Sequence, residues 1–177
     1  AADTAVDPRV TRALTALFNF MQGKELAGQE RATGVAGFMA GFFDATLQDR
    51  LRFLQDGQQR CFESFTESAD DAARAAWEQL CGAELVEQIE RMRQGAVRTT
   101  SAQRGQGELG DLWFDLTSAR MDTMKQIEDQ LADAMVSLSS AIKAGLSLAQ
   151  ALDILAQQTP VPICQEFQQI VGEYQLG

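Results

Sequence analysis

The sequence predicts an all-α protein, an up-and-down helical bundle of about four long helices with a short C-terminal helical pair. Several long segments carry apolar residues at steps of three and four, the spacing of one face of a helix. No segment alternates apolar and polar residues as a half-buried strand does, and no hairpin dipeptide separates two apolar runs. The connections are short, so consecutive helices are expected to run antiparallel.

The first predicted helix begins at Asp7, a good N-cap, with Pro8 at the first helical position. Its apolar face comprises Leu14, Leu17, Phe18 and Met21. The helix then continues through four glycines, each costing about 1 kcal/mol relative to alanine. They are Gly28, Gly34, Gly37 and Gly41. Glycines on one side of a helix admit either a second backbone or a small ligand, so close packing and a ligand-lining face both stay open.

Two further helices are predicted, over residues 47–68 and 70–97. The seam of the earlier one comprises Leu47, Leu51, Leu54, Gln58, Cys61, Phe62 and Phe65. The inward stripe of the later one comprises Trp77, Leu80, Leu85, Ile89 and Met92. Residues 98–110 have three glycines and no apolar periodicity, so they predict a loop.

A fourth long helix is predicted to start near Asp111. Its heptad-like seam favours a homodimer, and comprises Leu116, Met124, Ile127, Leu131, Ala134, Leu138 and Ala141. Ser147 is a plausible N-cap for a short helix that Pro160 would stop, and a last helix follows from about residue 163. Charged residues become rare near Leu138, which divides the chain into a sensor-like bundle over 1–137 and a second helical segment over 138–177.

Composition excludes several function classes. The net charge is -10, with acids and bases interspersed, so no basic stripe is available for nucleic acid. No apolar run approaches the roughly 20 residues of a membrane span, and the first residues lack the features of a signal peptide. A cytoplasmic location is expected, either free or as the soluble part of a membrane-associated protein.

The residues that usually carry catalysis or metal binding are scarce. The chain has no histidine, and its three cysteines are far apart, so Cys61, Cys81 and Cys164 are interpreted as buried thiols. The acidic cluster of the fourth helix, Glu128, Asp129 and Asp133, is interpreted as a solvated face. Without a phosphate loop or a nucleophile elbow as well, we expect no enzyme activity, no cofactor and no metal.

Two stretches resemble the second half of the NIT family, the nitrate- and nitrite-sensing helical domain, over about residues 8–131. One carries the KE-x-x-GQER core from Lys24 to Arg31 and the QxRCF segment at residues 58–62. The other, residues 112–131, carries WF-x-x-T and IEDxL. The resemblance implies two helical bundles side by side, each supplying an arginine to a small anion pocket. No QKER-type segment of the first half precedes these motifs, so one half is expected here.

The resemblance implies that Arg31 of GQER is the ligand arginine of this half. A guanidinium offers a rigid fork of donors to a planar anion such as nitrate. Thr33, Arg60 and Lys24 are the further candidates for the pocket. The alternative is that Arg31 pairs with Glu25 or Glu30, or points to water. A homodimer would bring two copies of Arg31 together.

The tail suggests a second family. Residues 131–177 carry AG-x-SL-x-QAL and EF-x-x-I-x-x-E-x-x-LG, and resemble the start of the cytoplasmic domain of the type II secretion F family, in its tight-adherence pilus branch. This resemblance implies a helical interaction domain of a secretion platform that contacts an assembly ATPase. Two hypotheses follow: a sensor that relays anion binding to an output domain by helix repacking, and a structural interaction domain.

Overall fold

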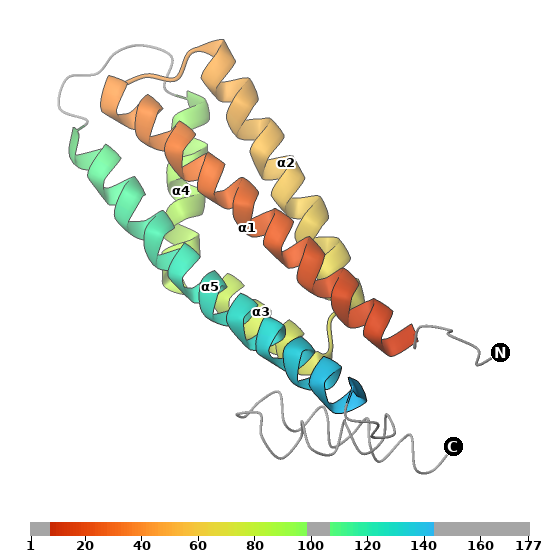
Figure 1. Cartoon of the computed structure of the whole chain (residues 1–177). Helices are drawn as coiled ribbons and strands as arrows, with labels where there is room; N and C mark the ends of the chain where they lie inside the picture. The colour runs from red at the N-terminus through yellow and green to blue at the C-terminus, as the bar shows by residue number, and fades with distance from the viewer. Residues whose placement is uncertain (1–7, 99–106, 144–177) are drawn as a thin grey trace.

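The described part of the protein consists of α-helices and short connections. The computed structural model describes residues 8–98 and 107–143 (Figure 1). The helices are α1 (Pro8–Ala40), α2 (Ala45–Ser68), α3 (Asp71–Cys81), α4 (Glu84–Arg98) and α5 (Gly107–Lys143). This confirms the predicted all-α bundle. The predicted C-terminal helical pair lies outside the described residues, and α5 runs without a break across the predicted domain boundary at 137/138.

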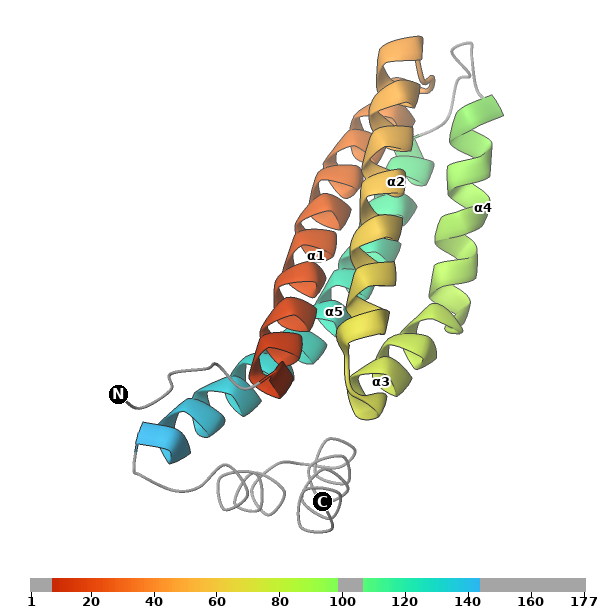
Figure 2. The same ribbon diagram turned by 90° about the vertical axis from the view of Figure 1, so that its right-hand side faces the viewer.

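Helix α1 lies between α2 and α5. It packs against α2 on one side and α5 on the other, while α3 and α4 pack against α5 (Figure 1). Both α2 and α5 run antiparallel to α1 (Figure 2). The four sides of the bundle are therefore α1, α2, α5 and the consecutive pair α3 and α4.

The turn between α1 and α2 ends one helix and begins the next within a few residues. Gly41 adopts a φ of 78°, a left-handed conformation that favours glycine. Its N–H donates to the carbonyl of Phe38 at 3.2 Å, and the N–H of Phe42 donates to that of Gly37. Asp44 then caps α2 by accepting from the N–H of Leu47 at 2.8 Å.

The single helix predicted over residues 70–97 is wrong, because the chain breaks into α3 and α4. Gly82 caps α3, and its N–H donates to the carbonyl of Glu78 at 2.9 Å. The N–H of Ala83 donates to Leu80 instead of continuing the helix. The break changes the direction of the chain, so that α4 stands beside α5 (Figure 2). Trp77 and Ile89 consequently enter different hydrophobic clusters.

Helix α5 begins at Gly107, earlier than the start predicted near Asp111. Gly110 is buried against the end of α1, where an added Cβ would lie 2.6 Å from the Met39 sulfur. Gly110, which the sequence analysis assigned to a loop, therefore allows the first turn of α5 to approach α1 closely.

Two aromatic clusters form the core, one at each end of the bundle. In the first, Phe20 makes edge contacts with Phe65 and Trp77, at centroid distances of 4.9 and 5.9 Å. In the second, Phe38 lies 5.4 Å from the ring of Trp113. Buried polar residues lie between the two ends, and they form the site described below.

The glycines of α1 make room for these rings. A Cβ on Gly34 would lie 2.3 Å from the indole of Trp113, and one on Gly37 would lie 2.1 Å from the ring of Phe43. Close packing is therefore the correct interpretation at these two positions.

The interpretation of the cysteines as buried thiols is wrong for Cys81, which is exposed, and Cys61 is only half-buried. Cys81 ends α3 and lies about 100° around the helix from the core-facing Leu80. Cys164 lies outside the described residues. Within the described helices, none is both long and apolar enough to cross a membrane.

We expect Gly34→Ala to lower the free energy of unfolding by about 1–3 kcal/mol, because the methyl group would overpack against the rigid indole of Trp113. Gly95→Ala is the control, since a Cβ there meets no atom within 4 Å. Its better helix propensity should stabilise the protein by about 1 kcal/mol. Urea unfolding of both variants measures these changes in the free energy of unfolding. Equal changes in the two variants would show that Gly34 has no packing role.

Candidate functional site

Arg31 lies in the seam between α1 and α5, where it is half-buried. One guanidinium nitrogen donates to the hydroxyl of Ser118 at 3.0 Å, and the guanidinium carbon lies 5.2 Å from the centre of the Phe114 ring. The backbone carbonyl of Arg31 accepts a hydrogen bond from the indole of Trp113 at 3.0 Å. No carboxylate among the described residues forms an ion pair with Arg31. Its positive charge therefore has no counter-ion in the part of the chain that the structure describes.

The predicted alternative, pairing of Arg31 with Glu25 or Glu30, is wrong. Glu25 accepts a hydrogen bond from Gln29, and Glu30 accepts two from Arg93. Glu30 and Arg31 are adjacent on α1, so their side chains leave the helix about 100° apart. That rotation directs Glu30 into the core and Arg31 along the seam with α5.

The other three predicted site residues do not converge on Arg31. Thr33 donates its hydroxyl hydrogen to the carbonyl of Gln29 on its own helix. Lys24 lies two turns before Arg31 on the α5 side of α1 and forms an ion pair with Glu128. Arg60 is exposed on α2 and makes no polar contact with the rest of the described chain. The structure therefore places Lys24 and Arg31 along one seam and the other two elsewhere.

Glu128 belongs to the acidic cluster predicted to be solvated. It is partly buried and lies near Lys24 and Lys125, whereas Asp129 is exposed. Lys24 and Lys125 therefore compensate the negative charges of Glu128 and Asp129. Nowhere in the described ranges do three acids or cysteines gather as they would around a metal ion.

A buried polar cluster at the centre of the bundle was missed by the sequence analysis. Glu30 is 1% exposed and receives two hydrogen bonds from Arg93 of α4, at 2.8 and 2.7 Å. It also accepts from the amides of Gln55 and Gln58 of α2, at 3.0 and 2.8 Å. One carboxylate therefore joins three helices, α1, α2 and α4.

The partners of Glu30 reverse the effect of its burial. Burial alone would raise the pKa of the carboxyl, but the charge and hydrogen bonds of Arg93 and the Gln58 amide outweigh it and lower the pKa. Burial likewise works against the charged form of Arg93, but its contacts with Glu30 leave the pKa of the guanidinium raised. Both groups are ionised at neutral pH.

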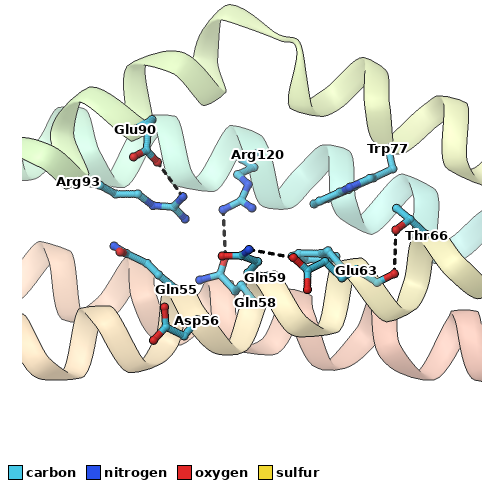
Figure 3. Close-up of a pocket in the computed structure, with 11 residues that line it drawn as sticks. Gln55, Asp56, Gln58, Gln59, Glu63, Thr66, Trp77, Glu90, Arg93 and Arg120 are labelled. Carbon is cyan, nitrogen blue, oxygen red and sulfur yellow. Dashed lines mark hydrogen bonds and ion pairs between the residues drawn. The ribbon is translucent and has the colours of Figure 1, made fainter.

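Arg120 of α5 reaches the same region from the opposite side. It is 8% exposed, and its guanidinium donates to the side-chain amide oxygen of Gln58 at 3.2 Å. Burial lowers the pKa of Arg120 to about 10, and the positive charge of Arg93 acts in the same direction. No acid of the described helices lies within ion-pair distance of it. Figure 3 shows Arg120 and Arg93 entering one cavity of about 460 Å³ from different helices.

Some of this cluster left a signal in the sequence. Gln58 occupies an apolar position of its helix seam, and Arg120 follows Trp113 and Thr117 on the core-facing stripe of α5. A polar residue on an apolar stripe predicts a buried polar contact. Glu30 and Arg93 left no comparable signal, because their pairing depends on how α1 and α4 approach each other.

We expect Glu30→Gln to lower the melting temperature at neutral pH, because it leaves Arg93 with only the exposed Glu90 as an ion-pair partner among the described residues, a loss of up to about 3–5 kcal/mol. The wild type should lose this stability as pH falls below 4.5 toward the depressed pKa of Glu30. The two melting curves should therefore converge in acid. Glu25→Gln, on the exposed side of α1, should follow the wild type. Parallel curves for Glu30→Gln and wild type would contradict this.

Three comparisons with known proteins bear on identity. The family model described as "Nitrate and nitrite sensing", NIT, matches residues 1–136. The "Nitrate regulatory protein" of Klebsiella oxytoca is 36% identical over 143 residues, which are 81% of this chain and 35% of that protein. The structure of the NasR transcription antiterminator superimposes with a TM-score of 0.69 at 35% identity, covering 94% of this chain and 44% of the other.

The chain thus spans about a third of the length of the curated relative that it matches. The predicted resemblance of residues 131–177 to the secretion F family finds no support in these comparisons, and most of that segment lies outside the described residues. The NIT resemblance is confirmed, and its match covers GQER, QxRCF and WF-x-x-T. This chain belongs to the NIT family of nitrate- and nitrite-sensing domains.

Proposed function

We propose that this chain is a sensor module that binds nitrate or nitrite at Arg31 and relays the binding through α5. The observation that carries the proposal is the guanidinium of Arg31, which has no counter-ion among the described residues, in a chain of the nitrate- and nitrite-sensing family. Only one of its nitrogens donates to a side chain of the described residues, so other donors of the fork are available to a planar anion.

The surroundings of Arg31 suit a small monoanion. The Phe114 ring excludes water from one side of the guanidinium, which strengthens its attraction for an anion. The Ser118 hydroxyl accepts from Arg31 and can turn its own hydrogen toward the ligand. The bond from Trp113 to the Arg31 carbonyl holds α1 and α5 in register at this point.

A relay to an output domain follows from the position of the site between two helices. An anion on Arg31 would compete for the hydrogen bond that the guanidinium donates to Ser118. If it binds one relative position of α1 and α5 more tightly than another, it shifts the populations of the two. Helix α5 is 37 residues long and carries such a shift well beyond the site.

A second guanidinium would complete the pocket, and we propose that a second copy of the chain supplies it. The heptad-like seam predicted on α5 to form a dimer is occupied within the bundle, since Met124 and Ile127 are buried. The available seam is on α1, where alternating steps of four and three connect largely exposed positions. It comprises Leu14, Phe18, Met21, Glu25, Gly28, Ala32, Val35 and Met39.

Arg31 immediately precedes Ala32, a residue of this α1 seam. Arg31 therefore occupies a flanking position, and side chains at flanking positions approach the partner helix in a coiled coil. Pairing along the seam would therefore bring two copies of Arg31 toward the interface. The alternative, a helical interaction domain that contacts a secretion ATPase, is not favoured, since it rests on the tail resemblance alone.

We expect sodium nitrate or nitrite to raise the melting temperature beyond sodium chloride of equal concentration, because a ligand of the folded state stabilises it. Arg31→Ala should weaken nitrate binding about tenfold or more in calorimetric titration, the value of a hydrogen bond to a charged group. Arg60→Ala, which removes an exposed arginine of α2, is the matched control and should bind as the wild type. Equal weakening by both variants would reject Arg31 as the ligand.

We expect nitrate to promote dimerisation in sedimentation velocity experiments. Phe18→Asp should raise the dimer dissociation constant at least about tenfold, because it places a charge on the α1 seam. Phe53→Asp is the control, since Phe53 is 58% exposed, close to the 62% of Phe18, but lies on α2. If the chain stays monomeric at all concentrations with nitrate present, the proposal that a second copy supplies the second guanidinium is wrong. The second arginine of the pocket would then belong to a bundle that corresponds to the first half of the family fold.

A further inference from the structure

The cavity that contains Arg120 is separate from the α1–α5 seam. It lies between α2 on one side and α3 and α4 on the other, with α5 behind (Figure 3). Its volume of about 460 Å³ is in the usual range for small-molecule sites. One end is apolar, where the rings of Phe62 and Trp77 stack at 4.1 Å. The other end is polar, with Gln55 and Arg93.

The buried guanidinium of Arg120 forms no ion pair with an acid of the described residues. Arg93, the other arginine of the cavity, forms ion pairs with both Glu30 and Glu90. Among the described residues, Arg120 donates only to the neutral side-chain amide oxygen of Gln58, whose amide nitrogen donates to Glu30. Glu30 and Glu90 act on Arg120 only from a distance. A buried cation without a counter-ion is costly. A bound carboxylate would give Arg120 a direct counter-ion, with two oxygens matching the guanidinium fork.

The rim of the cavity carries the opposite charge. Three acids line the rim and are exposed: Asp56, Glu63 and Glu90. Glu90 is paired with Arg93, whereas the carboxylate of Glu63 accepts only from the neutral amide of Gln59 within the described helices. These acids repel a multiply charged anion and attract a cationic group. The lining therefore suits a ligand that carries one charge of each sign.

We propose that this cavity binds the zwitterion of a small amino acid, with its carboxylate on Arg120 and its ammonium group toward Glu63. The stacked rings of Phe62 and Trp77 offer an apolar wall to the side chain, and the amide groups of Gln55 and Gln59 offer polar contacts.

The amino-acid site does not rest on the function proposed for Arg31. Ser118 and Arg120 are two residues apart on α5, so their side chains leave the helix about 200° apart. One contacts Arg31 and the other enters the cavity. The two sites share a helix but no ligand-binding atom, so nitrate binding and amino-acid binding can each fail alone.

The test is thermal melting and calorimetric titration of the whole chain with each standard amino acid at millimolar concentration, against equal sodium chloride. For each amino acid that binds, the amine lacking the carboxylate and the acid lacking the amine are controls. We expect at least one amino acid to raise the melting temperature and both truncated compounds to bind at least about tenfold more weakly.

Arg120→Gln should abolish the binding, and Glu63→Gln should weaken it, while Arg31→Ala should leave it unchanged. Glu63 is exposed, so its substitution reports on the site even if Arg120→Gln does not fold. The proposal is overturned if no amino acid stabilises the chain, or if a stabilising one acts equally on Glu63→Gln and the wild type. It is also overturned if Arg31→Ala removes the binding, which would assign the effect to the anion site in the α1–α5 seam.

Discussion

The ionised carboxylate of Glu30 is the constraint on which the middle of the bundle depends. Aromatic rings fill both ends, but between them Glu30 joins α1 to α2 through two amides and to α4 through Arg93. Such a buried pair adds little net stability, since desolvation offsets most of its attraction. Its contribution is to specify the arrangement, because any other placement of α4 would leave a buried charge unpaired.

Helix α5 connects the two candidate sites because its residues face two directions. Trp113 and Ser118 contact Arg31 across the seam with α1, whereas Arg120 projects toward α2 and the cavity. A shift of α5 along or around its axis would therefore alter both places. The Gln58 amide extends this connection to Glu30, the residue before Arg31. The network gives a physical route by which two ligands could influence each other.

The sequence by itself determined the helical class, most helix limits and many of the residues that face the core. Periodicity and caps were sufficient for this, because each depends on neighbours three or four residues away. The face predicted for the first helix is wrong, because Leu14, Phe18 and Met21 are exposed. Gln58 was placed on the apolar seam of its helix, whereas Arg120 lies on the core-facing stripe of α5 but was not among the predicted residues. The family motif containing Arg31 was the part of the candidate site that could be recognised.

Only the tertiary structure decided which charges meet. Arg31 is next to Glu30 in sequence, yet Glu30 pairs with Arg93, which is 63 positions away, while Arg31 meets Ser118. Thr33 and Arg60 were candidates by proximity to motifs, but rotation around each helix sends them elsewhere. The break at Gly82 sets the direction of α4, and therefore the direction in which Arg93 reaches the core. Ion pairs between helices depend on relative axis positions, which local patterns do not encode.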